Sequence, residues 1–236
     1  DSFNLRWFSP TVEVPLCGHA TLASAAVLYY VVGNQSECLT FDTLSGPLRV
    51  KRDGKYLCLD MPINKPSIVE KDAVEKLHAL IEATIGDLLV DCVYYSANTR
   101  KLLVRLMDST SRSKFEEFHP DFQSMMSSAP PRETIDVRGV IVTVKGSKEY
   151  CNEQGVQFDF VSRYFAPWMG INEDPVTGSA HTVLGSYWSE VLGKDEMLAR
   201  QCSARGGNLR VSILKNARVV VSGDAVVVLR GHIKYS

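Results

Sequence analysis

The sequence lacks long hydrophobic runs and net charge, and each absence excludes a class of protein. The longest apolar stretch, Ala20 to Val32, has only about 13 residues, whereas a membrane-spanning helix needs about 20. The 26 basic and 27 acidic residues nearly cancel to a net charge of −1, so no global field attracts nucleic acid or an anionic membrane. We therefore expect neither a membrane nor a nucleic acid as a partner.

The sequence also lacks paired cysteines. Its six cysteines are scattered without a C-x-x-C pair, which argues against a structural zinc site and a redox dithiol, and we expect no metal. A chain of 236 residues with 45% hydrophobic content can build packed cores without disulfides. Free thiols in a reducing compartment, and hence a cytoplasmic location, are the expectation.

The most informative stretch that is present is a loop of small residues, Asp-Pro-Val-Thr-Gly-Ser-Ala, that runs directly into an apolar helix. Gly178 lets the backbone approach a ligand closely, and Thr177 and Ser179 offer hydroxyls. Asp174 and His181 are titratable groups beside the unpaired N–H donors of a helix start. These residue types are typical of a pocket for a carboxylate or a phosphate.

The same construction occurs earlier in the chain, where an Arg-Trp-Phe strand leads to the loop Pro-Leu-Cys-Gly-His-Ala. The matching landmarks are Arg6 and Arg163, Phe8 and Phe165, Pro10 and Pro167, Gly33 and Gly193, and residues 48–50 and 209–211. The offset is about 157 in the lead-in and about 160 afterwards, which indicates an indel of roughly three residues. We infer two pseudo-equivalent halves, each placing one helix start at a shared interface.

Periodicity and turn residues predict the elements of each half. Helices are expected over 18–32, 70–85, around 115–126 and over 180–192, and strands over 4–8, 39–43, 47–51, 56–59, 91–95, 101–107, 139–144, 156–165, 207–214, 217–222 and 225–229. The first and last helices are apolar all round and should be enclosed on all sides. Residues 1–107 would form an N-terminal lobe, 108–136 a linker rich in Ser, Pro and charge, and 137–236 a C-terminal lobe.

The two loop motifs, together with Arg163-Tyr-Phe-Ala-Pro-Trp168 and Gln201-Cys-Ser203, resemble the PhzF (phenazine biosynthesis-like) family, and its vertebrate members in particular. The resemblance covers essentially the whole chain. It implies the α+β, diaminopimelate epimerase-like fold, in which two pseudo-symmetric lobes each wrap a β-barrel-like sheet around a central apolar helix. It also implies a cofactor-independent isomerase with its active site in the cleft between the lobes, and a homodimer.

Carried over by motif, His19 and Asp174 match the polar catalytic pair of the family, and Ser179 matches its active-site serine. Gly18 and Gly178 match the glycines at the two helix starts. The principal acid/base of the family is a glutamate in an amino-terminal segment that also supplies the first strands. This sequence, in which Asp1 lies just before the Arg-Trp-Phe strand, shows no counterpart of that segment.

Isomerisation of a carbon acid needs a base, an acid and dipoles that hold developing negative charge. Backbone N–H groups around Gly18, Ala20, Thr177 and Gly178 are candidates for binding a substrate carboxylate. His19 is expected to shuttle or orient a proton. Asp174 is expected to relay a proton or to hold a substrate amine; it also precedes a proline, as a good N-cap of the second helix does, and the two roles are compatible.

The remaining polar residues of the two loops are expected to play lesser roles. Ser179 and Thr177 should hydrogen-bond the substrate rather than act as nucleophiles, because no Ser–His–acid arrangement is visible. His181 is expected to be structural. Glu13 and Glu173 flank the two loops and are interpreted as surface carboxylates.

Cys17 supports an alternative function. Related racemases of this fold use a thiol at each helix start, but the counterpart of Cys17 is Thr177, whose hydroxyl is far too weakly acidic to act as a second base. A racemase or dehydratase that depends on Cys17 alone stays open. A third alternative is a catalytically silent binding or interaction protein that keeps the fold without the family's glutamate.

Overall fold

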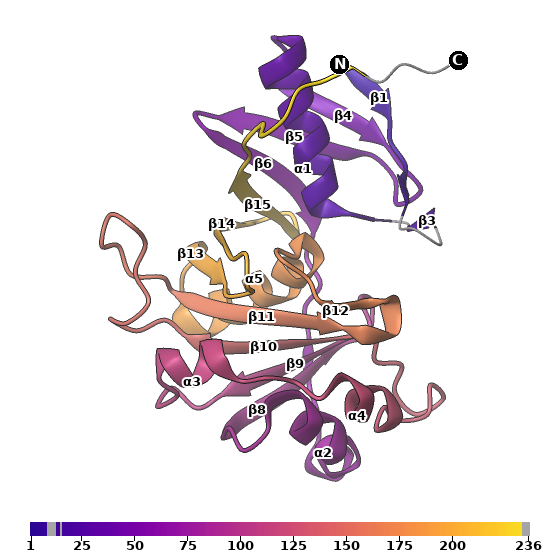
Figure 1. Cartoon of the computed structure of the whole chain (residues 1–236), viewed down its shortest axis with the longest axis vertical. Helices are drawn as coiled ribbons and strands as arrows, with labels where there is room; N and C mark the ends of the chain where they lie inside the picture. The colour runs from indigo at the N-terminus through magenta and orange to yellow at the C-terminus, as the bar shows by residue number, and fades with distance from the viewer. Residues whose placement is uncertain (9–12, 15, 233–236) are drawn as a thin grey trace.

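The computed structural model describes residues 1–8, 13–14 and 16–232. It shows a mixed α/β molecule with two bodies stacked along its long axis (Figure 1). One sheet runs through both bodies in the strand order β1-β4-β5-β6-β15-β14-β13-β11-β10-β9-β8-β7, and β12 pairs with β11 outside this path. Pro10 and Pro15, which belong to the repeated motif, lie outside the described residues.

The first body contains four strands of this sheet and one helical rod. Its elements are β1 (Ser2–Asn4), β4 (Cys38–Asp42), β5 (Leu48–Asp53), β6 (Tyr56–Pro62) and α1 (Gly18–Ala26), which continues as the π-helical segment η1 (Val27–Val32). A separate ribbon of β2 (Trp7–Phe8) and β3 (Glu13–Val14) precedes α1. The strand predicted over residues 4–8 is therefore interrupted, because β1 pairs with β4 whereas β2 pairs with β3.

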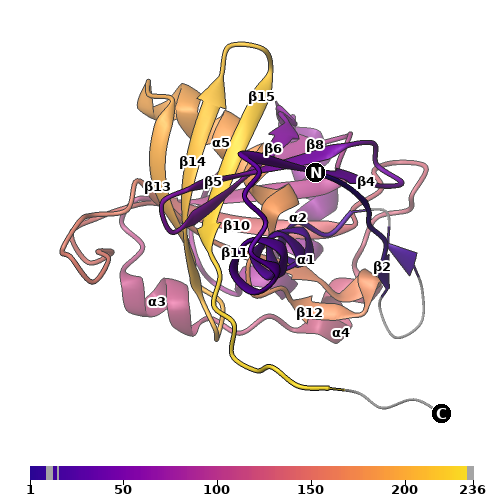
Figure 2. The ribbon, with the colours of Figure 1, turned by 90° about the horizontal axis from the view of Figure 1, so that it is seen from above.

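The second body contains most of the other elements. These are β7 (Ser67–Ile68), α2 (Lys71–Ile85), β8 (Val90–Ser96), β9 (Lys101–Leu106), α3 (Arg112–Glu117), α4 (Phe122–Ser127), β10 (Gly139–Lys145), β11 (Phe160–Ala166), the 3₁₀ helix η2 (Pro167–Met169), β12 (Ile171–Glu173), α5 (Gly178–Leu192), β13 (Glu196–Gln201) and β14 (Gly207–Leu214). The last strand, β15 (Arg218–Asp224), pairs with both β14 and β6 and so joins the two bodies. Figure 2 shows β13, β14 and β15 side by side beside α5.

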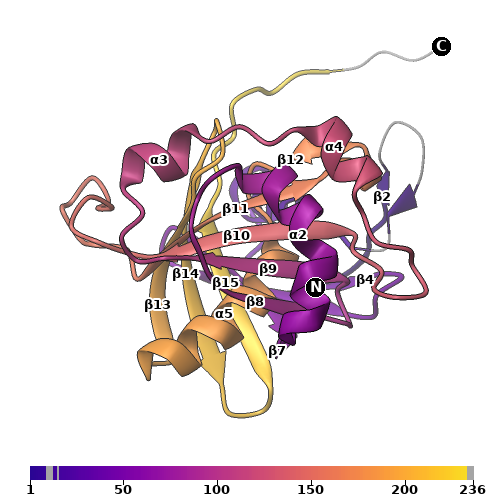
Figure 3. The ribbon, with the colours of Figure 1, turned by 90° about the horizontal axis from the view of Figure 1, so that it is seen from below.

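Strands β8–β11 separate two hydrophobic cores. Figure 3 shows α2, α3 and α4 on one face of these strands. Leu102 and Val140 belong to the cluster that includes the buried side of α2, whereas Leu103 and Ile141 belong to the cluster that includes α1 and α5. The alternation of side chains along β9 and β10 thus directs every second residue toward α5.

Helix α5 is enclosed from Ala180 to Trp188, as predicted, whereas Val191 in its last turn is 45% exposed. Every residue from Ala180 to Trp188 is buried. The sheet approaches it closely at Gly185, where an added Cβ would lie only 2.8 Å from a methyl group of Val211. Gly193, in the left-handed conformation at φ 66°, ends the helix at the predicted residue.

Helix α1 is not enclosed, and that prediction was wrong. Val27, Val31 and Val32 are 47%, 41% and 66% exposed, so the end of the rod has an open apolar face. Strands β4–β6 cover its other side, where Ala25 and Tyr29 are buried. The apolar composition of a helix therefore does not determine whether strands cover it on every side.

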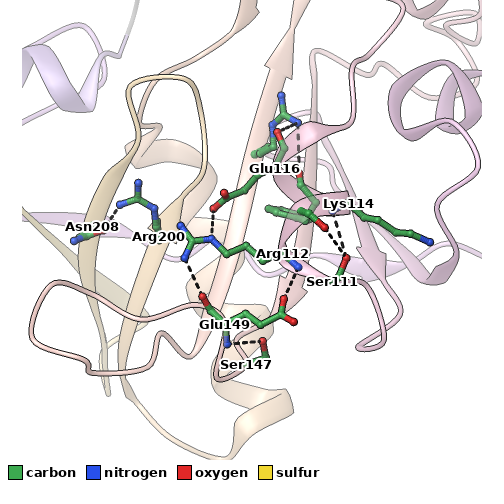
Figure 4. A network of polar contacts seen from close by, with 11 residues as sticks. Ser111, Arg112, Lys114, Glu116, Ser147, Glu149, Arg200 and Asn208 are labelled. Carbon is green, nitrogen blue, oxygen red and sulfur yellow. Dashed lines mark hydrogen bonds and ion pairs between the residues drawn. The ribbon is translucent and has the colours of Figure 1, made fainter.

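The segment between β9 and β10, predicted to hold one short helix, contains α3 and α4 with Pro120 between them. Ser111 and Asp121 cap these helices by accepting hydrogen bonds from backbone N–H groups. Figure 4 shows how Arg112 ties α3 to the β10–β11 loop: its backbone N–H donates to the Glu149 carboxylate at 2.7 Å and its guanidinium to the Glu149 carbonyl at 2.9 Å.

Two sequence predictions at strands failed. Residues 225–229 do not form a strand, and Val226 and Val228 are 79% and 91% exposed. Strand β13 was not predicted, because Glu196–Gln201 mixes charged residues with good helix formers. Its register with β14 nevertheless buries Met197 and Ala199.

The sheet continues without a break across the predicted lobe boundary. Strands β7–β9, which belong to residues 1–107, hydrogen-bond onward to β10 and lie in the second body. The division into lobes at residues 107 and 137 stays a prediction. All six cysteines are free, as predicted. Among the described residues, no helix combines the length and the apolar character that crossing a membrane requires.

Candidate active site

The starts of α1 and α5 lie against each other, as predicted. A Cβ atom added to Gly18 would lie 3.4 Å from the Cα of Gly178, and one added to Gly178 would lie 3.5 Å from the Cα of Gly18. The N-cap residues Cys17 and Thr177 both have extended backbones, with φ −142° and −112°, and neither side chain caps its own helix. Unpaired N–H donors of two helices are thus concentrated at one place.

The first turns of the two helices are built alike. The hydroxyl of Thr21 donates to the carbonyl of Cys17 at 2.7 Å, and Nδ1 of His181 donates to the carbonyl of Thr177 at 2.8 Å. His181 is fully buried, and burial lowers its pKa to about 4, so the imidazole is neutral near pH 7. This contact agrees with the structural role expected for His181.

The strands that lead into the two loops are also alike. Phe8 pairs with Glu13 in one half, and Phe165 pairs with Glu173 in the other. Arg6 donates to Glu13 at 2.8 and 2.7 Å, and Arg163 donates to Glu173 at 2.8 and 3.0 Å. Each glutamate is therefore the counter-ion of an arginine rather than a free acid or base, and both are partly covered rather than fully exposed.

Asp174 is not the N-cap of α5, since Thr177 occupies that position. Asp174 is only 8% exposed and accepts a hydrogen bond from the Thr177 hydroxyl. The amide of Gln201 holds the same loop from the other side: its oxygen accepts from the backbone N–H of Thr177 at 2.8 Å, and its nitrogen donates to the carbonyl of Asp174 at 2.6 Å. The backbone N–H of Asp174 donates to the carbonyl of Tyr164 at 3.0 Å. The carboxylate is thus fixed in place before any ligand arrives.

The charge of Asp174 acts on groups from both bodies. Burial lowers the pKa of Lys101 to about 8, and Asp174 partly offsets this effect. Burial raises the pKa of Tyr164, and Asp174 raises it further. Asp174 also raises the pKa values of Cys17 and His19, as a smaller contribution. Because electrostatic influence falls with distance, these four groups lie in the neighbourhood of Asp174.

Cys17 and His19 form a pair at the start of α1. The sulfur lies 3.5 Å from Nε2 of the imidazole. Burial alone would raise the pKa of Cys17, but hydrogen bonds from His19 and from the backbone of Ala20 lower it overall. The same contact with Cys17 raises the pKa of His19 despite partial burial. The pair is therefore shifted toward thiolate and imidazolium.

Ser179 is half-buried at the start of α5, and its hydroxyl forms no hydrogen bond with any residue that the structure describes. Its carbonyl accepts from the Thr182 hydroxyl at 2.8 Å. Ala20, at the start of α1, is half-buried too. The Ser179 hydroxyl is thus available to a ligand.

A cavity of about 710 Å³ opens beside the two helix starts. It is lined by Gly18, His19 and Gly178, by residues of β6, β14 and β15 such as Arg210, and by the loop residues Lys55 and Arg205. The cavity is not lined by Cys17, Asp174, Thr177 or Ser179. Only some of the predicted site residues therefore belong to its wall. Within the described ranges, no group of three or more His, Cys, Asp or Glu residues is arranged to hold a metal ion.

Sequence reasoning missed Lys101, Tyr164 and Gln201. Lys101 opens a strand whose other residues, apart from Arg105, are apolar, and a charge at its first position was the only local signal. Tyr164 lies within the Arg-Tyr-Phe motif of the repeat and of the family resemblance, and Gln201 within a motif of the resemblance alone, but neither pattern indicates a role in the site. Their contacts with the Asp174 loop depend on long-range strand pairing, which no local pattern encodes.

Comparison with known proteins identifies the family. The sequence model of PhzC-PhzF, described as phenazine biosynthesis-like protein, matches residues 1–231. The chain is 51% identical over 229 residues to the mouse phenazine biosynthesis-like domain-containing protein 1, which covers 97% of this chain and 76% of that protein. It is 43% identical over 236 residues to an uncharacterized isomerase of Pseudomonas aeruginosa, which covers 100% of this chain and 79% of that protein.

A solved structure of a PhzC/PhzF protein from Clostridium difficile matches with a TM-score of 0.80 and 37% identity, over 98% of this chain and 78% of that chain. The α+β architecture of the two bodies is therefore the diaminopimelate epimerase-like fold that the resemblance implied. With a family match along nearly its entire length and a relative more than half identical, the chain belongs to the PhzC-PhzF family of phenazine biosynthesis-like proteins.

Proposed function

We propose that this chain is a cofactor-independent isomerase that moves a proton on a small carboxylate-bearing substrate held at the cleft between the two bodies. The observation that carries the proposal is the contact between two helix starts, with Asp174, His19 and Cys17 around it. The similarity to a bacterial protein named as an isomerase supports the same reaction class.

The helix starts supply the binding energy for the carboxylate. Each carries about half a unit of positive charge and several unpaired N–H donors. Because the Cα atoms of Gly18 and Gly178 are nearly in contact, an anion does not fit between them and must lie beside them. There it meets the backbone N–H groups that follow the two glycines, including that of Ala20, and Thr177 keeps the second loop in shape.

The acid and base are assigned by charge. The Asp174 carboxylate is the base or holds a substrate amine. The Thr177 hydroxyl, which donates to it, and Gln201, which fixes the loop, keep it in one orientation. His19, whose pKa is raised by Cys17, is the acid that returns the proton. The free hydroxyl of Ser179 donates a hydrogen bond to the negative charge that develops on the substrate between proton removal and proton return.

A second candidate is a racemase or dehydratase that uses Cys17 as its base. The 3.5 Å contact with His19 and the lowered pKa of the thiol favour it. The equivalent position on α5 is Thr177, whose hydroxyl is bound to Asp174, so a symmetric two-thiol mechanism has no second base.

The same observations bear on origin and assembly. We infer that the two halves arose by internal duplication, which accounts for the equivalent arginine–glutamate pairs and helix starts. We also propose a cytoplasmic homodimer, as the family resemblance and the free cysteines favour. Light scattering at micromolar concentration would show a mass of two chains, and a mass of one chain would contradict the dimer.

The test of function is solvent deuterium exchange. The protein, with any segment that its gene encodes beyond this chain, is incubated in D₂O with a panel of amino, hydroxy and unsaturated carboxylic acids. We expect one carbon position to exchange, with a loss of about a hundredfold or more in Asp174→Asn and His19→Ala and no loss in the exposed control His119→Ala. Under the first candidate Cys17→Ser retains exchange but changes its pH dependence, because His19 loses the thiol that raises its pKa, whereas under the second candidate it abolishes exchange. Binding without exchange in every acid contradicts both and favours a binding protein.

A further inference from the structure

Lys101 is a buried cation without a counter-ion. It is 8% exposed, at the first position of β9. None of the ion pairs among the described residues includes it. Its ammonium donates one long hydrogen bond, of 3.4 Å, to the carbonyl of Thr99. Since an ammonium has three donors, two have no hydrogen-bond partner among the described residues.

Other covered cations of the second body do have carboxylate partners. The side chain of Arg163 is 8% exposed and pairs with Glu173, and that of Arg105 is 15% exposed and pairs with Asp91 and Asp108. Burying an unpaired charge costs several kcal/mol, so a cation left without a partner is costly to retain. The packing of the folded chain therefore does not explain why Lys101 is buried without a carboxylate partner.

The surroundings of Lys101 place it on the side of the sheet that faces α5. Its ammonium lies 5.5 Å from the centre of the Tyr164 ring. Gly139, the register partner of Lys101, leaves room for the Tyr164 ring beside the ammonium. A Cβ added to Gly139 would lie 2.1 Å from the tyrosine oxygen. The charge of Asp174 reaches both Lys101 and Tyr164, although no Asp174 oxygen pairs with the ammonium.

We propose that Lys101 binds an acidic group of the substrate beside Asp174. The ammonium then gains the anion that the folded chain does not supply, with the face of Tyr164 completing its surroundings. A substrate acid held between Lys101 and the Asp174 loop also places its neighbouring carbon next to the proposed base. The inference rests on the proposed function, and it narrows the substrate class to acids whose charged group lies close to the exchanging carbon.

The experiment measures binding of malonate, a small dianion, by nuclear magnetic resonance. The backbone amides of Gly178 and Ser179 report on the helix starts, and the labelled side-chain nitrogen of Lys101 reports on the new site. The variants are Lys101→Met, Lys101→Arg and a control, Lys145→Met, which removes an exposed lysine from the far end of the adjacent strand.

We expect malonate to shift the Lys101 resonance in the unmodified chain, and we expect Lys101→Met to lose at least about tenfold in affinity. Lys101→Arg should retain most of the affinity and Lys145→Met all of it. If the helix-start amides shift but the Lys101 resonance does not, or if Lys101→Met loses less than that, the Lys101 proposal is overturned and the carboxylate site of the proposed function stands. If neither group of resonances shifts, both proposals fail.

Discussion

The helical rods that begin at Gly18 and Gly178 have similar sequences and different surroundings. From Ala180 to Trp188, α5 is buried without a gap. The first rod, in contrast, leaves its α-helical geometry at Val27, which is 47% exposed whereas its counterpart Tyr187 is buried; near their ends both rods are open, with Val31 and Val191 41% and 45% exposed. Apolar composition alone therefore does not determine the burial of a central helix, because burial depends on how many strands the chain brings around it.

The two helix starts also differ in their chemistry. The first presents Cys17 and His19, which are paired and partly open to solvent. The second presents Asp174 and Thr177, which are buried and fixed by Gln201. The two helix starts thus have similar extended N-cap backbones but different groups: a thiol–imidazole pair that can exchange a proton at the first, and a fixed carboxylate at the second. An isomerase needs such an asymmetry between acid and base.

The largest expected difference concerns matched core substitutions. Trp188 is fully buried and stacks on Phe160 with ring centres 5.6 Å apart, so Trp188→Ala should lower the free energy of unfolding by about 3–5 kcal/mol. Leu28, its counterpart on the first rod, is half-buried, so Leu28→Ala should cost about 1–2 kcal/mol. Urea unfolding monitored by fluorescence and circular dichroism measures both. Equal losses would show that the open rod is packed as firmly as α5.

The next difference concerns pH. In the unfolded chain His181 binds a proton once the pH falls below its ordinary pKa of 6.5. In the folded chain His181 stays neutral until the pH reaches its lowered pKa of about 4. The unfolded state therefore gains protons first, and stability should fall by about 3 kcal/mol as the pH falls from 6.5 to 4.

His181→Thr copies the residue of the first half, since the hydroxyl of Thr21 caps the equivalent carbonyl. We expect this variant to be less stable at pH 7 because of the lost imidazole, but to lose the part of the acid dependence that His181 contributes. The exposed control His119→Thr should keep the full dependence. Urea titrations at half-unit pH steps measure the slopes, and an unchanged slope in His181→Thr would refute the assignment.

A smaller effect is expected at the two arginine–glutamate pairs. Arg163 is almost fully covered, so Glu173→Gln leaves a buried guanidinium without its counter-ion and should cost about 2 kcal/mol. Arg6 is largely exposed, so Glu13→Gln should cause no loss that unfolding experiments resolve. Similar losses in the two variants would contradict the difference in burial.

The smallest effect is expected at the two N-cap positions. Cys17, whose pKa is lowered by His19 against the effect of burial, should react with iodoacetamide at pH 7 faster than Cys202, whose pKa burial raises to about 12. In Thr177→Cys the new thiol would lie beside Asp174 without a histidine partner, and we expect it to react about tenfold more slowly than Cys17. Mass spectrometry of the alkylated peptides gives both rates. A Thr177→Cys thiol as reactive as Cys17 would contradict the electrostatic difference between the two helix starts.

Local sequence signals predicted the helices, their glycine ends and the meeting of the helix starts. The glycines at 33 and 193 and the apolar spacing between Ala180 and Leu192 are short-range features, and they were sufficient. The strand β13 and the unpaired residues 225–229 were predicted wrongly, because strand formation depends on which neighbour is available in space.

The candidate site was predictable only where a motif carried it. Asp174 and His19 lie in loops whose composition points to a ligand, and the structure brings both into electrostatic contact. Lys101 and Tyr164 join them through parallel pairing of Lys101 with Gly139, 38 residues away, and antiparallel pairing of Ile141 with Tyr164, 23 residues away. Such pairing has no signature in a window of the sequence, so the unpaired charge of Lys101 became visible only in the fold.

The position of β15 bears on how the chain folds during synthesis. Residues 218–224 pair with all of β6 in the first body and with β14 in the second. Before the ribosome has made residues 218–224, β6 still has an open edge, and unpaired edges invite aggregation. The two bodies cannot be joined through β15 until residues 218–224 emerge, so a chain truncated before Arg218 should associate through these edges rather than persist as a folded half.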